Sequence, residues 1–415
     1  MRILIISFYF PPYNTIGAVR VGKLAKYLAR HGNEVRVVTA RDPSWVGKIE
    51  ETLPTEISPD WVLRTPWIQP PASIVSRRQT RQVSGIQGKN GWRSWLATTL
   101  TPSPYGTAGW IPSAAQTIHK LSRTWRPDVI LASALPPTAL LLGAWASKRL
   151  GVPWVADLRD PWADNHYHRH SRMRQQLEQR IERSVLTTAA SIVTVTKPWV
   201  EMYKEKYELP VFHIPNGYDP EDYKGLRAKR LVAEESLSIV YLGTLYGGRR
   251  DPAPLLDAVR LIESKTSIRL FFFGPDSNLV SQSNNLKSIE HLVEMKEPVP
   301  YSDSLSIQLG ADVLLILVWD TPSERGMIPA KVFEYMGAGK RILCVAPQGS
   351  EVSRLVKEYD LGLVSRNPEE IANWLVALDK SSSPVESSQG KNLKQHTREQ
   401  QAIEMREVLQ DAANR

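Results

Sequence analysis

A chain of 415 residues is too long for one hydrophobic core, so we expect two large domains. The single cysteine excludes a disulfide within the chain and favours a reducing compartment. A net charge of +9 would suit a nucleic-acid binder, but the sequence has no helix-turn-helix, zinc-finger or RNA-binding signature, so we expect no nucleic-acid partner. No segment has the roughly 18 apolar residues that cross a bilayer. We therefore predict a cytoplasmic protein.

Short apolar strands alternate with helices through the first half of the chain. The expected strands are Arg2–Ser7, Glu34–Thr39, Asp128–Ala132, Pro153–Asp157, Ser191–Thr196 and Val211–Ile214. The expected helices are Gly17–His31, Ala114–Trp125, Pro137–Leu150, Ser171–Ala189 and Pro198–Tyr207. Apolar strands without alternation are typical of a parallel sheet covered by helices on both faces. Residues 1–217 are thus predicted to form a Rossmann-like domain.

The loop after the first strand leads into a helix at Gly17. A glycine near a helix start lets a ligand approach the backbone, and Arg20 could meet a phosphate or a carboxylate. The alternative is an ordinary strand–helix turn with a solvated arginine.

Residues 66–115 are a basic segment within this domain. They contain five Lys or Arg, no Asp or Glu, and Trp67, Trp92, Trp95 and Trp110. Basic residues interleaved with tryptophan suit the headgroup layer of an anionic membrane. We therefore expect peripheral attachment to an anionic membrane, on the inner face of the plasma membrane. The alternative is an insertion whose tryptophans pack on the domain.

Asp157, Arg159 and Asp160 follow a buried strand, at the edge of the sheet where α/β folds bind ligands. A carboxylate at this edge could accept a hydrogen bond from a hydroxyl group or act as a base. The alternative is an Asp–Arg pair that stabilises a loop. His166, His168 and His170 come next, but no cysteine or well-placed acid accompanies them, so we expect no metal site. A single histidine acting on a substrate hydroxyl remains open, and we select His166.

The second half repeats the strand–helix alternation. The expected strands are Ser238–Leu242, Ile268–Phe273, Val313–Val318, Arg341–Val345 and Gly362–Val364. The expected helices are Pro252–Ser264, Ser302–Leu309, Pro329–Gly337, Glu351–Lys357 and Pro368–Asp379, with a final helix at Leu393–Leu409. We therefore predict a linker at 218–235, a second domain at 236–390 and a C-terminal helix within 391–415.

The turn after Ser238–Leu242 is rich in glycine and arginine. Gly243, Thr244 and the glycines at 247 and 248 bring backbone N–H groups near a pyrophosphate, while Arg249 and Arg250 supply charge. Turns use glycine for many reasons, so this pattern alone is weak.

The segment PSERGMIPAKVFEYMGAGKRILCV at 322–345 carries the strongest signal. Lys331 and Glu334 share one face of a short helix close to its N-terminus, where anions bind. The lysine suits a phosphate, and the carboxylate suits a vicinal diol such as ribose. The alternative is an exposed helix pair of a few tenths of a kcal/mol. Anion and sugar recognition together indicate a nucleotide-sugar pocket.

The K-x-F-E-Y-M-x-x-G-K pattern at 331–340 resembles the donor-site segment of family-four glycosyltransferases. DLRDPWADN at 157–165 is similar to the R-D-[LP]-W motif of the same subgroup. Two doubly wound α/β domains followed by a final helix resemble the GT-B architecture of that family, in which the domains face a cleft and the last helix crosses back. The resemblance covers most of the chain.

The resemblance implies roles for the residues singled out above. It implies that Glu334 holds the donor ribose, that Lys331 and Arg249 stabilise the departing diphosphate, and that Asp160 faces the reacting sugar. The residues implied to contact the donor are Gly243, Thr244, Arg250, Gly326, Met327, Ile328 and Glu334. The residues implied on the acceptor side are Gly17, Arg20, Asp157 and His166.

The chain departs from the family pattern at two places. Many family members have a glutamate eight positions before Glu334, where this chain has Gly326, so backbone N–H groups of Gly326–Ile328 are expected to replace it. Family members commonly have two glycines in the N-terminal loop, where this chain has Ile16-Gly17. Donor-phosphate contact at that loop is therefore in doubt.

We expect a hexosyltransferase-type enzyme that moves a sugar from a nucleotide diphosphate sugar to a hydroxyl of a glycan or lipid-linked acceptor, in cell-surface polysaccharide or glycolipid biosynthesis. The resemblance implies retention at the anomeric carbon, with no metal and no cofactor. One alternative is a sugar-nucleotide epimerase, which shares the GT-B fold. Another is a noncatalytic nucleotide-sugar-binding protein, favoured by Gly326.

Overall fold

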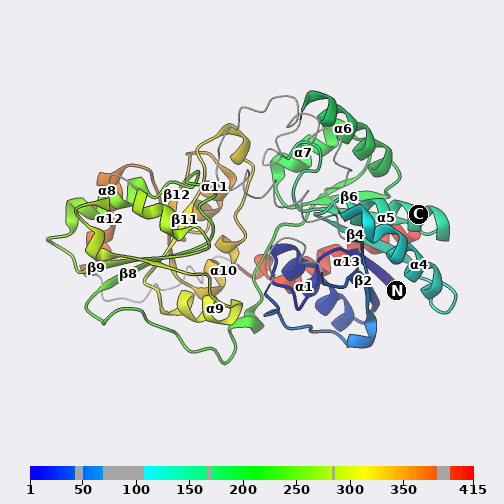
Figure 1. Ribbon diagram of the computed structural model, residues 1–415, viewed down its shortest axis with the longest axis horizontal. Coiled ribbons are helices and arrows are strands. Elements are labelled where there is room, and N and C mark those ends of the chain that lie inside the picture. The colour runs from blue at the N-terminus through cyan, green and yellow to red at the C-terminus, as the bar shows by residue number, and fades with distance from the viewer. Residues whose placement is uncertain (43–49, 69–106, 166–170, 283–285, 381–392) are drawn as a thin grey trace. The chain divides into compact units, whose positions relative to one another are not determined.

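The computed structural model describes residues 1–42, 50–68, 107–165, 171–282, 286–380 and 393–415. The chain divides into two compact units, the first made of Met1–Asn216 with Arg398–Arg415 and the second of Gly217–Thr397 (Figure 1). Each unit has its own parallel sheet and its own hydrophobic core.

The first unit is built on a sheet in the order β3-β2-β1-β4-β5-β6-β7. Its strands are β1 (Arg2–Ser7), β2 (Glu34–Ala40), β3 (Val62–Thr65), β4 (Val129–Ala134), β5 (Trp154–Leu158), β6 (Ser191–Thr194) and β7 (Val211–His213). All neighbouring strands pair in parallel. The chain starts at β1 in the middle, winds to β3 and then returns through β4, which places a switch in winding direction between β1 and β4.

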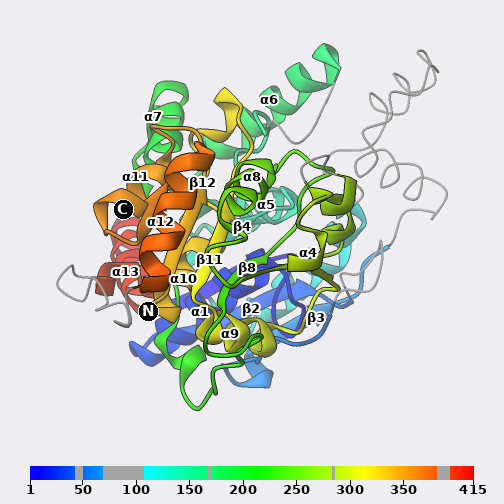
Figure 2. The ribbon, with the colours of Figure 1, turned by 90° about the vertical axis from the view of Figure 1, so that its left-hand side faces the viewer.

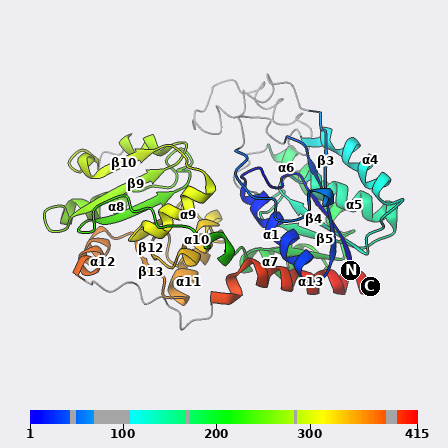
Figure 3. The same cartoon turned by 90° about the horizontal axis from the view of Figure 1, so that it is seen from below.

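Alternate residues of the central strand supply the two faces of this sheet. Leu4 and Ile6 pack toward α4 (Ile111–Leu121), α5 (Thr138–Leu150), α6 (Arg172–Leu186) and α7 (Lys197–Lys206). Ile3 and Ile5 pack toward α1 (Ile16–Arg30) and α13 (Arg398–Asn414). This period-two division explains why the strands are apolar throughout. Figure 3 shows α13 lying along α1 on that face.

The second unit repeats the design with strand order β10-β9-β8-β11-β12-β13. The strands are β8 (Leu237–Leu242), β9 (Ile268–Phe273), β10 (Val293–Lys296), β11 (Val313–Leu317), β12 (Arg341–Val345) and β13 (Gly362–Val364). One face is covered by α8 (Ala253–Ile262) and α12 (Pro368–Lys380), which lie side by side (Figure 1). The other is covered by α9 (Tyr301–Gly310), α10 (Lys331–Ala338) and α11 (Glu351–Glu358).

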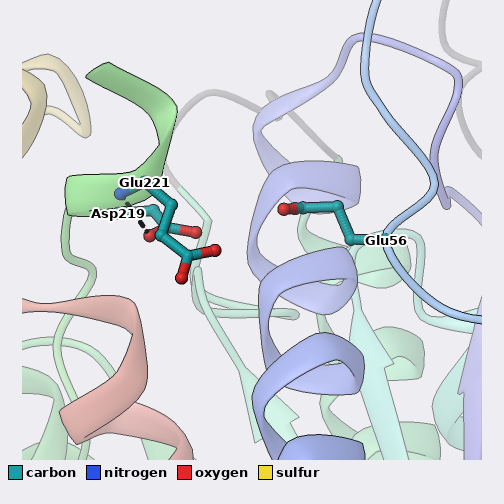
Figure 4. Close-up of side chains that lie close together, drawn as sticks. All are labelled: Glu56, Asp219 and Glu221. Atoms are coloured by element: carbon teal, nitrogen blue, oxygen red, sulfur yellow. Dashed lines mark hydrogen bonds between the residues drawn. The ribbon is translucent and has the colours of Figure 1, made fainter. Parts of the chain in front are cut away.

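These observations confirm two parallel α/β units, and they correct several details of the expected elements. The two edge strands β3 and β10 were missed, because each has only four residues with little apolar character. The expected linker at 218–235 is part of the second unit, where Tyr223, Leu231 and Val232 pack on the core. A 3-10 turn, η3 (Pro220–Tyr223), lies within it, and Asp219 accepts the Glu221 N–H at 2.9 Å to cap this turn (Figure 4).

The final helix has the expected length but lies five residues further along the chain. The sequence predicts one helix over Leu393–Leu409, but the structure has a 3-10 turn at Leu393–His396 and α13 only from Arg398. The break at Thr397 is where the chain passes from the second unit to the first. Within the residues described, no helix is both long and apolar enough to span a membrane.

Candidate functional site

In the second unit, the winding direction changes between β8 and β11, which pair with each other (Figure 2). Connections leave these two strands in opposite directions, so their carboxyl ends border a crevice in the manner of doubly wound folds. The Gly-rich turn follows β8, and the segment that leads to α10 follows β11. The strand order thus brings the two strongest sequence signals to the same edge of one sheet.

Lys331 and Glu334 form the centre of the candidate site. Glu334 Oε2 accepts hydrogen bonds from Lys331 Nζ at 2.7 Å and from Gln308 Nε2 at 2.9 Å. Lys331 Nζ also donates to Ser304 Oγ at 3.2 Å. The Glu334 side chain is only 16% exposed, so this is a supported, half-buried cluster and not a solvated helix pair.

The second carboxylate oxygen of Glu334 is the open position in this cluster. Both donors go to Oε2, and no hydrogen bond to Oε1 occurs among the described residues. The backbone of Glu334 is held as well, because the Tyr223 hydroxyl donates to the Glu334 carbonyl oxygen at 2.7 Å. A Cβ added at Gly337 would lie 2.7 Å from the Tyr218 ring and 2.8 Å from the Tyr223 ring. The glycine therefore lets η3 pack closely beneath α10.

The Gly-rich turn is held by a residue that the sequence did not point to. The Asp276 carboxylate accepts the Leu245 N–H at 2.8 Å and the Gly247 N–H at 3.4 Å. Gly243 N–H bonds to the Phe273 carbonyl, and the Thr244 carbonyl accepts the Tyr241 hydroxyl. The N–H groups of residues 243, 245 and 247 are thus taken up within the unit, which reduces the anion cradle expected here.

The two arginines of this turn have different surroundings. The Arg249 guanidinium lies 4.8 Å from the centre of the Trp319 ring, and Arg250 lies 4.5 Å from that of Tyr246. Burial raises the pKa of the Tyr241 hydroxyl to about 12, and the nearby Arg250 acts against this increase. Arg250 therefore stabilises the turn, while Arg249 faces a cavity.

That cavity has a volume of about 240 Å³ and lies at the carboxyl ends of β11 and β12. It is lined by Gly248, Arg249, Asp251, Val318, Trp319, Asp320, Val345 and Arg366. Arg366 pairs with Asp320 at 2.9 Å. Two guanidinium groups beside an indole suit a ligand that combines negative charge with a flat or apolar surface.

The loop before α10 contains the three residues expected to replace a family glutamate. Gly326, Met327 and Ile328 are each half-buried, and the Met327 N–H bonds to the Glu324 carbonyl at 2.9 Å. The side chain of Glu324 is buried. The Met327 N–H is therefore used within the loop, so only the N–H groups of Gly326 and Ile328 could replace the family glutamate.

In the first unit, Asp157 and Arg20 lie inside the fold. They are 0% and 1% exposed, and Arg20 Nη2 contacts Asp157 Oδ1 at 2.9 Å. Ser133 Oγ donates to Asp157 at 2.7 Å, and Arg20 also donates to the carbonyls of Ile214 and Pro215. Arg20 is therefore buried in an ion pair, which excludes the alternative of a solvated arginine, and the acceptor-side roles of Arg20 and Asp157 stay predictions.

Gly17, Arg159 and Asp160 remain near the surface. Arg159 Nη1 lies 3.2 Å from the position that a Cβ would take on Gly17, so this glycine makes room for the guanidinium at the start of α1. Arg159 Nε lies 3.6 Å from Asp160 Oδ2, and the Asp160 side chain is 29% exposed. Asp160 therefore has a partly exposed carboxylate, whereas the Asp157 carboxylate is buried.

The predictions for His166 and for the basic segment at 66–115 can be compared with the structure only in part. His166 and most of the basic segment at 66–115 lie outside them. Two of its tryptophans are described. Trp110 is fully buried and donates to Thr65, and Trp67 donates to the Asp42 carbonyl at 2.9 Å. Both pack on the domain, which agrees with the alternative for these two side chains.

Gln308 and Asp276 are the supporting residues that sequence reasoning missed. Gln308 is fully buried, as are Leu305 and Ile307 on the same helix, and a polar side chain among buried positions could have signalled a specific partner. Asp276 had no comparable signal, because it follows β9 whereas the Gly-rich turn that it contacts follows β8.

Comparison with known families begins with residues 17–217, which match the family model described as a glycosyl transferase 4-like domain. A probable glycosyltransferase, WbjE from Pseudomonas aeruginosa, is 23% identical over 269 residues. That match covers 58% of this chain and 63% of the relative, so the chain spans less than two thirds of the relative's length.

Similar solved structures extend over nearly the whole chain. WaaG, a glycosyltransferase involved in lipopolysaccharide biosynthesis, matches with a TM-score of 0.57 and 12% identity, over 98% of this chain and 99% of that one. Anabaena Alr3699/HepE, solved in complex with UDP-glucose, matches with a TM-score of 0.59 and 13% identity, over 99% and 100%. Likeness at this identity shows the fold. Residues 17–217 thus match a glycosyl transferase 4-like domain, and the chain has the GT-B fold.

Proposed function

We propose that this protein is a glycosyltransferase of the K-x-F-E-Y subgroup, which moves a hexose from a nucleotide diphosphate sugar to a hydroxyl of a glycan or lipid-linked acceptor. The transfer retains the anomeric configuration and needs no metal ion. The pathway is cell-surface polysaccharide or glycolipid biosynthesis, in keeping with the role of WaaG in lipopolysaccharide biosynthesis.

The open oxygen of Glu334 is the observation that carries this proposal. Lys331 and Gln308 hold Oε2, which leaves Oε1 to accept hydrogen bonds from a ligand. A fixed carboxylate with one vacant oxygen suits the two hydroxyls of a ribose, because each hydroxyl can donate to it. Since Lys331 and Gln308 hold the side chain in place, little conformational entropy is lost on binding.

Positive charge near Glu334 completes the donor site. Lys331 and Arg249 would stabilise the negative charge that develops on the departing diphosphate, which is a form of electrostatic catalysis. In the first unit, Asp160 is our choice for the carboxylate that faces the reacting sugar, because its side chain is partly exposed at the end of β5. The acceptor would supply the attacking hydroxyl.

Membrane attachment is part of the proposal and rests on charge. Residues 1–215 hold 28 Lys or Arg and 15 Asp or Glu, whereas residues 216–415 hold 24 and 28. An excess of positive charge in the half expected to bind the acceptor would attract an anionic membrane surface. Flotation with phosphatidylglycerol vesicles should retain the protein, and purely phosphatidylcholine vesicles should not. Equal retention by both would contradict the charge argument.

The central experiment is a thermal-shift and donor-hydrolysis panel with UDP-glucose, GDP-mannose, ADP-glucose and CDP-glucose. A ligand that binds only the folded state raises the melting temperature by mass action. We expect one nucleotide class to stabilise the wild type and the effect to be lost in Glu334→Ala. Glu263→Ala, which removes an exposed carboxylate at the end of α8, is the matched control and should behave as wild type.

The same panel separates the alternatives. Epimerised donor in the absence of any acceptor would indicate an epimerase, and tight binding without hydrolysis or transfer would indicate a noncatalytic binding protein. No shift with any of the four sugars would overturn the proposed donor site. Activity that persists after EDTA treatment is the expected result for metal independence, and loss restored by Mg²⁺ would contradict it.

A further inference from the structure

A network of buried acids lies behind the Asp160 loop. The helix α6 carries Glu178 and Glu182, which are 0% and 1% exposed and have no role in the site described above. They are four residues apart, so both point to the same face of α6. Buried carboxylates are costly unless they are paired or hydrogen-bonded, so their partners indicate why they are there.

Glu178 holds a tryptophan of the loop. Its Oε2 accepts the Trp162 indole N–H at 2.9 Å, and its Oε1 accepts from Arg174 Nε at 2.9 Å. Trp162 is 1% exposed and Arg174 is 4% exposed. Arg174 neutralises the carboxylate within α6 itself, so the second oxygen is left to fix Trp162.

Glu182 holds the next residue of the loop by its backbone. Its Oε2 accepts the Ala163 N–H at 2.7 Å, and its Oε1 accepts the Tyr207 hydroxyl at 2.8 Å. Tyr207 follows α7, which lies beside α6 (Figure 1). The next residue, Asp164, pairs with Lys206 at the end of α7.

The anchored residues are close to Asp160 in the chain. Only Pro161, which is buried and has a fixed φ, separates Asp160 from Trp162. The residue before a proline is also restricted in conformation. The position of the Trp162 indole therefore determines where the Asp160 carboxylate lies, with few free torsions between them.

We infer that Glu178 and Glu182 are positioning residues, which hold the 160–164 loop so that the Asp160 carboxylate faces the reacting sugar. The inference rests on the proposed glycosyl transfer and assigns residues to it that do not touch the substrate. Errors of about 1 Å in such positioning reduce turnover by up to about a hundredfold.

The two glutamates should respond in opposite ways to the same substitution. Among the described residues, Glu178 faces two groups that can only donate, an indole N–H and a guanidinium, so an amide would place its NH₂ against one of them. Glu182 accepts hydrogen bonds from a backbone N–H and from a hydroxyl that can also accept, and the Lys206 ammonium lies 3.9 Å from its Oε1, beyond hydrogen-bond distance. Glu182→Gln therefore keeps both hydrogen bonds, whereas Glu178→Gln loses one.

The test measures donor hydrolysis and donor binding in four variants of the full chain. We expect Glu178→Gln and Glu182→Met to lower turnover by about tenfold or more, with the donor-induced thermal shift unchanged. Glu182→Gln should stay close to wild type. Glu201→Gln, an exposed acid on α7, is the control and should have wild-type turnover.

A double-substitution cycle isolates the Trp162 contact. Trp162→Phe keeps the apolar packing and removes the indole N–H donor. In that background Glu178→Gln should reduce turnover only slightly, because the glutamine amide can turn its oxygen to Arg174. Equal losses from Glu178→Gln in both backgrounds would show that the effect does not pass through Trp162.

Hydrogen exchange gives a readout that is independent of activity. The Ala163 amide should lose protection in Glu182→Met and keep it in Glu182→Gln. Wild-type turnover in folded Glu178→Gln and Glu182→Met would overturn the inference, as would a parallel loss of donor binding, which indicates general damage. If the wild type neither binds nor hydrolyses any donor, the proposed function fails, and exchange at Ala163 still tests the anchoring.

Discussion

At the scale of single residues, the structure gives each charged group of the candidate site a defined partner. Lys331 and Glu334 were recognisable from the sequence because their spacing and neighbours form a pattern. Gln308 and Asp276 were not, because the role of a buried amide or carboxylate depends on the tertiary contacts that it makes. The same holds for Arg20, because the sequence did not show that the carboxylate it contacts would be that of Asp157.

Replacing Gln308 tests the support of Glu334. In Gln308→Leu the carboxylate keeps Lys331 and loses a hydrogen bond of 2.9 Å. Hydrogen bonds to charged groups contribute about 1.5–3 kcal/mol, so we expect donor affinity to fall by about tenfold or more. Isothermal titration with the donor identified in the panel measures this. Gln348→Leu, at an exposed position, is the control, and equal losses in the two variants would contradict the prediction.

At the scale of elements, the helices and central strands followed from the apolar pattern, and the short edge strands did not. β1, β9, β12 and β13 have the boundaries that the sequence predicts. β3 and β10 have four residues each and depend on a neighbouring strand more than on their own composition. Loop conformation was equally hidden, because the Gly-rich turn is shaped by Asp276 at the end of a different strand.

The hydrogen bonds of Asp276 are expected to hold the Gly-rich turn in one conformation. Asp276→Asn leaves one acceptor oxygen for two N–H groups, so one of Leu245 and Gly247 loses its partner. We expect a loss of about 1 kcal/mol in the free energy of unfolding and faster hydrogen exchange at 245–247. Asp257→Asn on α8 should change neither. Unchanged exchange in Asp276→Asn would show that the turn is fixed by other contacts.

The buried Glu182 makes the free energy of unfolding depend on pH. Burial raises the pKa of Glu182, although its hydrogen bonds to Ala163 and Tyr207 act against this. A raised pKa means that the folded state binds more protons than the unfolded state, so this group stabilises the fold at low pH and loses that contribution as pH rises. The free energy of unfolding of wild type minus that of Glu182→Gln should thus be larger at about pH 5 than at about pH 8. Chemical denaturation at both pH values measures it, and a difference that grows with pH would contradict the sign.

At the scale of the whole molecule, the sequence predicted two α/β domains and the structure confirmed them. The discontinuity of the first unit was implied by the family resemblance, in which the last helix crosses back, and not by the apolar pattern. Its last helix comes after the whole of the second unit, and Met405 and Leu409 of α13 lie in the same core cluster as Leu24 and Leu28 of α1. Helical periodicity alone predicts that α13 is buried and does not say against which sheet.

The discontinuity predicts how fragments behave. Residues 217–397 contain a complete sheet with both faces covered, and their ends are joined by a hydrogen bond of 3.0 Å from Tyr218 N to His396 O. We expect this fragment to fold alone, with a cooperative thermal transition. Residues 1–216 lack α13 and expose the apolar face that packs against it, so we expect aggregation or a molten state unless 398–415 is fused to them. Cooperative unfolding of 1–216 alone would contradict this expectation.

The return of α13 to the first unit also affects how the chain is made. A ribosome releases residues 1–216 early, yet the part of α1 and of the sheet that α13 covers stays uncovered until residues 398–415 are translated. The second unit therefore completes its fold before the first, although it is encoded later. A nonsense mutation at the start of α13 would thus damage the first unit of the protein and leave the second intact.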